Sequence, residues 1–426
     1  MGTAKILLAD RLAQRLVASA GRISTTEGSA LEIFEAAQGD ERDFRLIRKV
    51  LSSGHHSILE HQPVGIAFDG VSVLCEQFMI ESRLAAFTVK SRRYVDFSHA
   101  GFVLPETAEE GFSRRMEELF ALYTQLVEMG IPREDARFVL PYCFRSNFYM
   151  SLNAREMVKV IGSMLWGRGC VFPEIRALGQ QLAEQFDALY PGVLEAERPR
   201  HKNDLPEILP DFLEEGKPAR GGARLLGAPD GELLRAATAF SGRTKDLSEL
   251  LVDARPRELE LVNAVFLVEN ASLSCVTHFA RHRIQSPLWW NASKALARGN
   301  YVLPESIAKN EEAAVAYKDA FRRQADFVRE QRSGGMCLED TAYLALSGHT
   351  SDILFSMNGR ELLHFFKLRT CNRAQWEIRG IAREMLRLLV EREPEIFRGF
   401  GPSCLVEGKC PEGKLSCGHP VTKELW

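Results

Sequence analysis

The sequence predicts a mixed α+β fold that is built twice along the chain. Short apolar runs of strand length are followed by segments with helical periodicity, as in residues 64–69 and 71–80. Sequence blocks also recur in one order at a nearly constant offset, namely residues 102–107 with 301–306 and residues 150–156 with 355–361. Isolated short matches would not stay in register, so we expect a tandem duplication.

Length and composition limit the class of protein. The 426 residues allow two or three domains, and two is the simpler number. The formal net charge of −3 gives no basic excess, so no nucleic-acid partner is predicted. Without a signal-peptide pattern or a membrane-spanning apolar run, we expect a cytoplasmic protein. The nine cysteines are expected to be reduced thiols.

The first half contains a helical segment over residues 30–51, a turn that includes Ser57, a strand and a helix. This helix, predicted over residues 71–80, ends in Glu81-Ser82-Arg83. Pro, Gly and charged residues then accumulate between the halves, which is typical of a linker. We therefore expect a first domain over residues 1–200, a linker over 201–225 and a second domain over 226–426.

The second half carries a different sequence at the end of the corresponding helix, Arg281-His282-Arg283, followed by Ser286. Guanidinium forks and a hydroxyl are groups that grip phosphate oxygens, so this end is predicted to bind an anion. A later helix has Arg360 and His364 one turn apart on one side. Its apolar face is formed by Leu362, Leu363, Phe365, Phe366 and Leu368.

These two stretches resemble the motifs of the flavin-dependent thymidylate synthases. The Arg-His-Arg triplet and the serine behind it match the hallmark of that family. The later stretch matches a second series at Asn358, Arg360, His364, Arg369, Gln375, Glu377 and Arg379. The resemblance covers both halves and implies two family copies, each with helices packed on a small antiparallel sheet.

The resemblance also implies chemistry and site residues. Methylation of dUMP to dTMP would use FAD, with methylenetetrahydrofolate and NADPH as co-substrates. The residues implied to hold FAD are Ser57, Arg281, His282, Arg283, Ser286, Asn358, Arg360 and His364. Those implied to bind the nucleotide are Ser91, Arg93, Arg137, His278, Arg281 and Arg369. Arg369 would lie against the uracil and be catalytic, whereas the alternative for each arginine is a structural salt bridge.

Each copy departs from the family pattern at different positions. Ala342 stands in the second copy where the first has Arg137, and the first-copy counterpart of Arg369 falls near Met164. The losses complement each other, so a family tetramer is expected to be rebuilt as a homodimer. Val89 and Trp289 replace acidic or amide residues of the family, which changes the substrate edge. A flavoprotein oxidoreductase with altered chemistry and a noncatalytic nucleotide-binding or assembly protein stay open as alternatives.

The C-terminal tail contains Cys404, Cys410, Cys417 and His419. Four such side chains match the ligand number of a structural zinc site. Their spacing is not that of a standard zinc knuckle, and a flexible reduced tail is the alternative. The sequence alone therefore assigns no metal.

Overall fold

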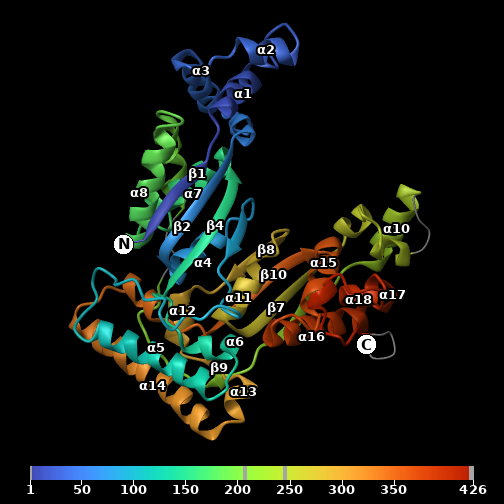
Figure 1. The fold of residues 1–426 in the computed structure, drawn as a ribbon. Coiled ribbons are helices and arrows are strands. Elements are labelled where there is room, and N and C mark those ends of the chain that lie inside the picture. The colour runs from blue at the N-terminus through green and yellow to red at the C-terminus, as the bar shows by residue number, and fades with distance from the viewer. Residues whose placement is uncertain (1, 205–208, 243–246, 422–426) are drawn as a thin grey trace. The chain divides into compact units, whose positions relative to one another are not determined.

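The computed structural model describes residues 2–204, 209–242 and 247–421, which fall into two units (Figure 1). Unit 1 comprises Met1–Gln125, Leu140–Asp211 and Asp326–Leu344. Unit 2 comprises Leu126–Val139, Phe212–Ala325 and Ala345–Trp426. Each unit therefore contains most of one sequence half and a short segment from the other half.

Unit 1 is built on a four-stranded antiparallel sheet with the order β1-β2-β4-β3. Its strands are β1 (Thr3–Leu8), β2 (Pro63–Ser72), β3 (Ala86–Val89) and β4 (Arg145–Asn153). In β2, Val64, Ile66 and Phe68 are buried in the core and the intervening residues are less buried. This two-residue period is that of a strand with one face on the core, as the sequence predicted.

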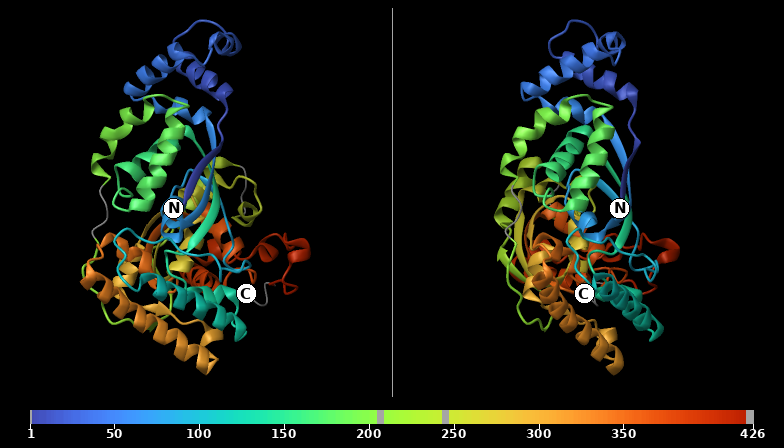
Figure 2. Two further views of the ribbon diagram at one scale, coloured as in Figure 1. Left: turned by 60° about the vertical axis from the view of Figure 1, so that its left-hand side comes forward. Right: turned by 90° about the vertical axis from the view of Figure 1, so that its left-hand side faces the viewer.

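Unit 1 also contains a set of helices. They are α1 (Arg11–Arg22), α2 (Ala30–Ala36), α3 (Glu41–Ser52), η1 (His56–His61), α4 (Val73–Ile80), most of α5 (Phe112–Glu128), α7 (Ala154–Leu165), α8 (Pro173–Asp187), α9 (Val193–Glu197), η3 (Arg198–Asn203) and η6 (Glu339–Leu344). Helix α8 packs on both α7 and β1, and Figure 2 shows these elements side by side in both views. The predicted helix before the Glu81-Ser82-Arg83 segment is α4.

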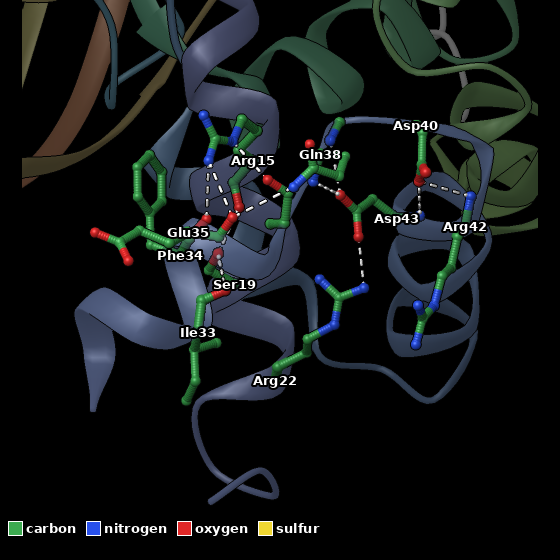
Figure 3. A network of polar contacts seen from close by, with 12 residues as sticks. Arg15, Ser19, Arg22, Ile33, Phe34, Glu35, Gln38, Asp40, Arg42 and Asp43 are labelled. Carbon is green, nitrogen blue, oxygen red and sulfur yellow. Dashed lines mark hydrogen bonds and ion pairs between the residues drawn. The ribbon is translucent and has the colours of Figure 1, made fainter. Parts of the chain in front are cut away.

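The single helix expected over residues 30–51 is divided into α2 and α3, which corrects that expectation. Asp43 causes the break, because its carboxylate accepts the backbone N–H groups of Gln38 and Gly39 at 2.8 and 2.7 Å (Figure 3). Arg22 also donates to Asp43 at 2.5 Å, and Arg15 donates to the Ala37 carbonyl at 2.6 Å. The turn between the helices is therefore held by side chains of α1 and α3.

Unit 2 repeats the sheet with the antiparallel order β6-β7-β10-β8. The strands of unit 2 are β5 (Pro218–Ala219), β6 (Gly222–Gly227), β7 (Asn263–Ser272), β8 (Gln285–Trp289), β9 (Tyr301–Val302) and β10 (Thr350–Asn358), of which β5 and β9 lie outside this four-stranded sheet. Its helices are α6 (Arg133–Ala136), η2 (Arg137–Val139), α10 (Gly231–Ser241), η4 (Leu247–Leu251), η5 (Arg257–Leu261), α11 (Leu273–Ala280), α12 (Ala292–Arg298), α13 (Glu305–Ala308), most of α14 (Glu311–Gly334), α15 (Gly359–Arg369), α16 (Trp376–Arg392), α17 (Pro394–Phe397), α18 (Ser403–Val406) and η7 (Gly413–Leu415). Across the described part of the chain, no helix combines the length and apolarity that crossing a membrane requires.

The same buried polar contact supports both sheets. Ser72 donates its N–H and hydroxyl to Glu174 at 2.7 and 2.5 Å in unit 1. Ser272 donates the same two groups to Glu377 at 2.7 and 2.6 Å in unit 2. Each serine hydroxyl also accepts the first free N–H of the helix that follows, at 3.0 Å. The repeated contacts match the duplication that the sequence predicted.

The two halves exchange equivalent segments. In unit 2, Asp135 from the first half accepts a hydrogen bond from Ser306 at 2.5 Å. In unit 1, Asp340 from the second half accepts the Thr107 hydroxyl at 2.7 Å and its N–H at 3.0 Å. Each unit is thus completed by a carboxylate that the other half of the sequence provides.

Helix α15 forms where the sequence predicted it and buries Leu362, Leu363, Phe365 and Phe366. Leu368 was also assigned to the apolar face but is 42% exposed, which corrects that assignment. Gly359 allows the helix to start close to η5, because a Cβ there would lie 2.8 Å from the Leu259 carbonyl oxygen. A larger residue would force the helix start away from this turn.

The predicted linker over residues 201–225 overlaps β5 and the first residues of β6. Residues 205–208 of this stretch lie outside the described residues. The boundaries of the two duplicated copies, residues 1–200 and 226–426, stay a prediction from the sequence. They differ from the two structural units, which each include a segment from both halves.

Candidate functional site

The candidate site lies at the end of α11 in unit 2. Ser272 caps the start of the helix, and the chain leaves it at Arg281. His282 is only 2% exposed, whereas Arg281 and Arg283 on either side are exposed. Two guanidinium groups are therefore presented to solvent around a buried imidazole.

His282 is held by two partners from α15. Its Nδ1 lies 2.9 Å from Oε1 of Glu361, and the Arg369 Nε–H donates to its Nε2 at 2.9 Å. Because a guanidinium can only donate, Nε2 must be the acceptor and the imidazole proton lies on Nδ1. The ring also packs edge-on against Phe365 with centroids 4.8 Å apart. The contacts thus define both the tautomer and the orientation of His282.

Burial and neighbouring cations favour a neutral imidazole. Burial, followed by the charges of Arg369, His364 and Arg281, holds the pKa of His282 well below its usual range. Burial raises the pKa of Glu361 to about 7, although Arg283 and Arg360 lower it. Near neutral pH the Glu361 carboxylate is only partly ionised, so the arginines give this cluster a net positive charge.

Arg137 belongs to unit 2 although it comes from the first half of the sequence. Its side chain is buried, and its Nε–H donates to the Glu134 carbonyl at 3.1 Å. Asp135 anchors this segment by accepting Trp376 Nε1–H at 2.6 Å as well as the Ser306 hydroxyl. The charge of Arg137 acts to lower the pKa of Glu377, which burial raises to about 7. The structure therefore brings Arg137 into the same unit as the Arg-His-Arg triplet.

The counterpart in unit 1 has lost most of these groups, although Arg83 stands at the position of Arg283 and Arg155 at that of Arg360. Glu81 follows α4 at the position of Arg281 and forms an ion pair with Arg168. Ser82 replaces His282, and the counterpart of Arg369 is the buried Met164. Ala342 occupies the position of Arg137 and is buried in unit 1. The same fold thus carries the Arg-His-Arg triplet in unit 2, while the equivalent place in unit 1 keeps one arginine of the triplet and has an acid in place of the other.

The other residues implied in unit 2 have identifiable surroundings. Asn358 caps α15 by accepting the Glu361 N–H at 2.9 Å, and Arg360 forms a 2.5 Å ion pair with Glu260. The ring of His364 lies 5.6 Å from that of His282. His278 is buried in the last turn of α11, and the exposed Ser286 lies in β8 opposite Ser356. Asn358 therefore has a structural role in addition to the predicted one.

Ser57, Ser91 and Arg93, assigned to the same site by resemblance, belong to unit 1. Ser57 is exposed in η1. Between Ser91 and Arg93, the buried Arg92 forms an ion pair with the buried Glu76. Glu76 also accepts the Ser146 hydroxyl, so this internal anchor fixes the segment that carries the serine and the arginine.

Sequence reasoning missed Glu361, which fixes the tautomer of His282. Its signal was a carboxylate on the buried side of an apolar helix, where an acid needs a partner. The motif series identified in the sequence did include Gln375 and Glu377, and both side chains make contacts that support the fold. Gln375 caps α16 through the N–H groups of Glu377 and Ile378 at 3.0 and 3.2 Å.

The sequence model of a family described as "Thymidylate synthase complementing protein" matches residues 6–192 and 232–395. The chain belongs to this family. The two matched stretches correspond to the two halves of the sequence, so the resemblance drawn from the Arg-His-Arg and Asn-x-Arg motifs is confirmed. The α+β class predicted from the sequence is confirmed as well.

Curated relatives within this family match about half of the chain. The flavin-dependent thymidylate synthase of Geobacter sulfurreducens is 36% identical over 200 residues, covering 46% of this chain and 86% of the relative. That of Pyrococcus abyssi is 36% identical over 180 residues, covering 39% of this chain and 73% of the relative. A solved UMP/dUMP methylase from Streptomyces cacaoi, bound with 5-Br dUMP, is 24% identical with a TM-score of 0.39 and covers 46% of this chain and 94% of that one.

Proposed function

We propose that this chain is a flavin-dependent thymidylate synthase that methylates dUMP to dTMP, or a close variant that acts on another uridine nucleotide. Membership of the family and the named relatives identify an enzyme of the methyltransferase type. The proposed cofactor is FAD, with methylenetetrahydrofolate as carbon donor and NADPH as reductant. The observation that carries the proposal is the Arg369 guanidinium, oriented by neutral His282 in unit 2.

The residues around His282 fit a flavin dinucleotide. Arg281 and Arg283 are exposed cations. Arg360, on α15 of the same unit, is partly exposed. A pyrophosphate needs such guanidinium donors. Ile284 and Leu288 next to the triplet are 62% and 69% exposed, which offers apolar surface to planar rings. Ser57, Ser286, Asn358 and His364 complete the proposed FAD set.

Bound flavin would supply the redox chemistry that no side chain here can supply. The chain's own residues bind and polarise the nucleotide. Arg369 commits its Nε–H to His282, which fixes the plane of its guanidinium. A fixed cation stabilises negative charge that develops on the uracil ring, and this effect is large where water is excluded. Arg369 is therefore the proposed catalytic residue.

His282 and Glu361 position this arginine. Because Glu361 holds the proton of His282 on Nδ1, Nε2 faces Arg369 as an acceptor. A protonated imidazole would instead repel the guanidinium, and the depressed pKa of His282 prevents this near neutral pH. Arg137, Arg281 and His278 are proposed to bind the nucleotide from unit 2. Ser91 and Arg93 are proposed to bind it from unit 1.

The duplication also supports an assembly. The resemblance implies that family members act as tetramers with sites built from several copies. Each chain here already contains two family-sized matches. We therefore propose a homodimer of this chain that acts as a pseudo-tetramer, in which unit 2 provides most of the cations of each site.

Product analysis tests the proposed function. The purified chain, supplied with FAD, is incubated with dUMP, methylenetetrahydrofolate and NADPH, and in parallel with UMP in place of dUMP. Mass detection of dTMP, or of the methylated ribonucleotide, supports the proposal. NADPH consumption without a methylated nucleotide would indicate an altered oxidoreductase instead. Nucleotide binding without any turnover would indicate the noncatalytic alternative.

A further inference from the structure

The C-terminal tail has little apolar material to hold it in place. Between Glu407 and Pro420, Cys410 and Cys417 are half-buried and every other residue is exposed. The helical elements of this region, α18 and η7, are single short turns. A segment of this kind usually depends on a metal or on disulfides for a defined structure. The two cysteines are the residues that turn inward.

Three of the cysteine sulfur atoms around the tail each lie close to one backbone N–H. The Arg373 N–H lies 3.5 Å from Sγ of Cys371, and the His419 N–H lies 3.4 Å from Sγ of Cys417. Both contacts join a cysteine to the residue two positions later. The Val421 N–H lies 3.4 Å from Sγ of Cys404. Such hydrogen bonds to sulfur stabilise thiolates that bind a metal.

Side-chain contacts join these turns to the end of α15. Asn372 Nδ2–H donates to the His419 carbonyl at 3.3 Å, which links the Cys371 turn to the Cys417 turn. Arg379 donates to the Asn372 carbonyl at 2.8 Å and Arg383 donates to Asn372 Oδ1 at 3.1 Å. Two cations therefore hold the turn beside which a thiolate cluster would accumulate negative charge.

Cys371, which follows α15, belongs to the same cluster as the three cysteines of the tail. Burial raises the pKa of the Cys371 thiol, and the nearby thiols of Cys417, Cys404 and Cys410 raise it further. The contacts of Asn372 with His419, of His419 with Cys417 and of Val421 with Cys404 bring the chain around Cys371, Cys404 and Cys417 together, and Cys410 is the other half-buried residue of the tail. All four cysteines also lie within unit 2.

We propose that Cys371, Cys404, Cys410 and Cys417 form a structural zinc site that pins the tail to the end of α15. Four thiolates suit Zn²⁺ because it is a soft ion that favours closed tetrahedral sulfur sites. Among the described residues no group of three possible ligands stands at metal-binding spacing, so the thiols would have to close around the ion on binding. The sequence suggested His419 as the fourth ligand, but Cys371 takes this place.

The site also bears on the reaction centre. Cys371 is two residues beyond Arg369, and Thr370 between them is fully buried. A metal at Cys371 would fix the last turn of α15, on which the contact between Arg369 and His282 depends. The zinc is therefore structural, and its presence can be measured without any assay of activity.

Metal analysis of the full chain tests this proposal. The chain is purified under reducing conditions and its zinc content is measured by mass spectrometry, for the wild type and for Cys404→Ser and Cys417→Ser. We expect about one zinc per wild-type chain and a loss of about tenfold or more in both variants. Cys170→Ser in unit 1 is the matched control and should retain the zinc.

Reconstitution keeps the proposal testable if a variant misfolds. Co²⁺ alone, added to the reduced metal-free wild-type chain, should produce the sulfur-to-cobalt charge-transfer bands of a tetrahedral thiolate site. Absence of these bands would overturn the proposal. It would equally be overturned by zinc that persists in both variants, or by a disulfide between any two of the four cysteines in the chain purified without reductant.

Discussion

The ends of α4 and α11 are equivalent in the two units, yet they carry opposite chemistry. Both helices follow a serine cap, and both caps are held by a buried glutamate, Glu174 or Glu377. The next residues are Glu81-Ser82-Arg83 in unit 1 and Arg281-His282-Arg283 in unit 2. The contacts that support the fold have been kept in both copies, while the groups that are proposed to bind a ligand differ. Equivalent backbone positions thus separate what folding requires from what function requires.

The exchanged segments extend this comparison. Asp135 and Asp340 make the same kind of hydrogen bond, to Ser306 and Thr107. Two positions after each aspartate, unit 2 receives Arg137 whereas unit 1 receives Ala342. Arg137 of the first half therefore lies in the same unit as Arg281 and Arg369 of the second half. This distribution is expected if one composite site has been kept for each chain.

The largest effect is expected from Arg369→Ala, which should reduce kcat by about a thousandfold because it removes the cation that is proposed to lie beside the uracil. The content of bound flavin should stay the same, since Arg369 is not assigned to the dinucleotide. Steady-state kinetics and the absorption spectrum check both parts. Arg387→Ala, which removes an exposed ion pair with Glu391, is the control and should retain activity. Normal turnover in the Arg369 variant would remove its catalytic assignment.

A matched pair at the two helix ends gives the next largest effect. Arg283→Ala should weaken FAD binding by about 10- to 100-fold, the loss expected for a charge-assisted hydrogen bond. Arg83→Ala makes the same change at the equivalent position of unit 1 and should leave the affinity within about twofold. Fluorescence titration of the flavin measures both dissociation constants. Equal losses in the two variants would mean that unit 1 binds flavin as well.

A smaller effect concerns pH and Glu361. Its folded pKa of about 7 lies above its ordinary value of 4.5, so the folded state binds the proton more tightly. Its contribution to stability is therefore full below about pH 4.5 and is lost as the pH rises through 7. Glu361→Gln keeps an acceptor for His282 but cannot titrate.

The measurement is the free energy of unfolding of wild type and Glu361→Gln at pH 5 and pH 8. The wild type should lose more stability over this interval than the variant, by on the order of 2 kcal/mol. Identical changes in the two proteins would show that burial does not shift this carboxyl group.

Local patterns predicted much of this structure. The short apolar run over residues 64–69 predicted β2, and the apolar spacing after Asn358 predicted α15. The Arg-His-Arg triplet also identified the family and the residues that gather at the end of α11. These features depend on neighbours in the sequence, so a pattern of a few residues carries them.

What the sequence did not predict depends on distant contacts. Asp135 and Ser306 are 171 positions apart, and no local pattern indicates that their segments are exchanged between the halves. The sequence also did not predict that Cys371 lies close to the tail. This proximity depends on the hydrogen bond between Asn372 and the distant His419 carbonyl. The break before α3 was local but was hidden, because Asp43 stops one helix while it supports the next.

The stoichiometry of ligand binding tests the central claim most directly. Calorimetric titration of the full chain with FAD, and then with dUMP, is combined with light scattering to count sites for each chain. The comparison of the two units predicts one flavin and one nucleotide per chain, in a dimer with two sites of each kind. Two equivalent flavin or nucleotide sites per chain would contradict it, because unit 1 would then bind without the cations that unit 2 has kept.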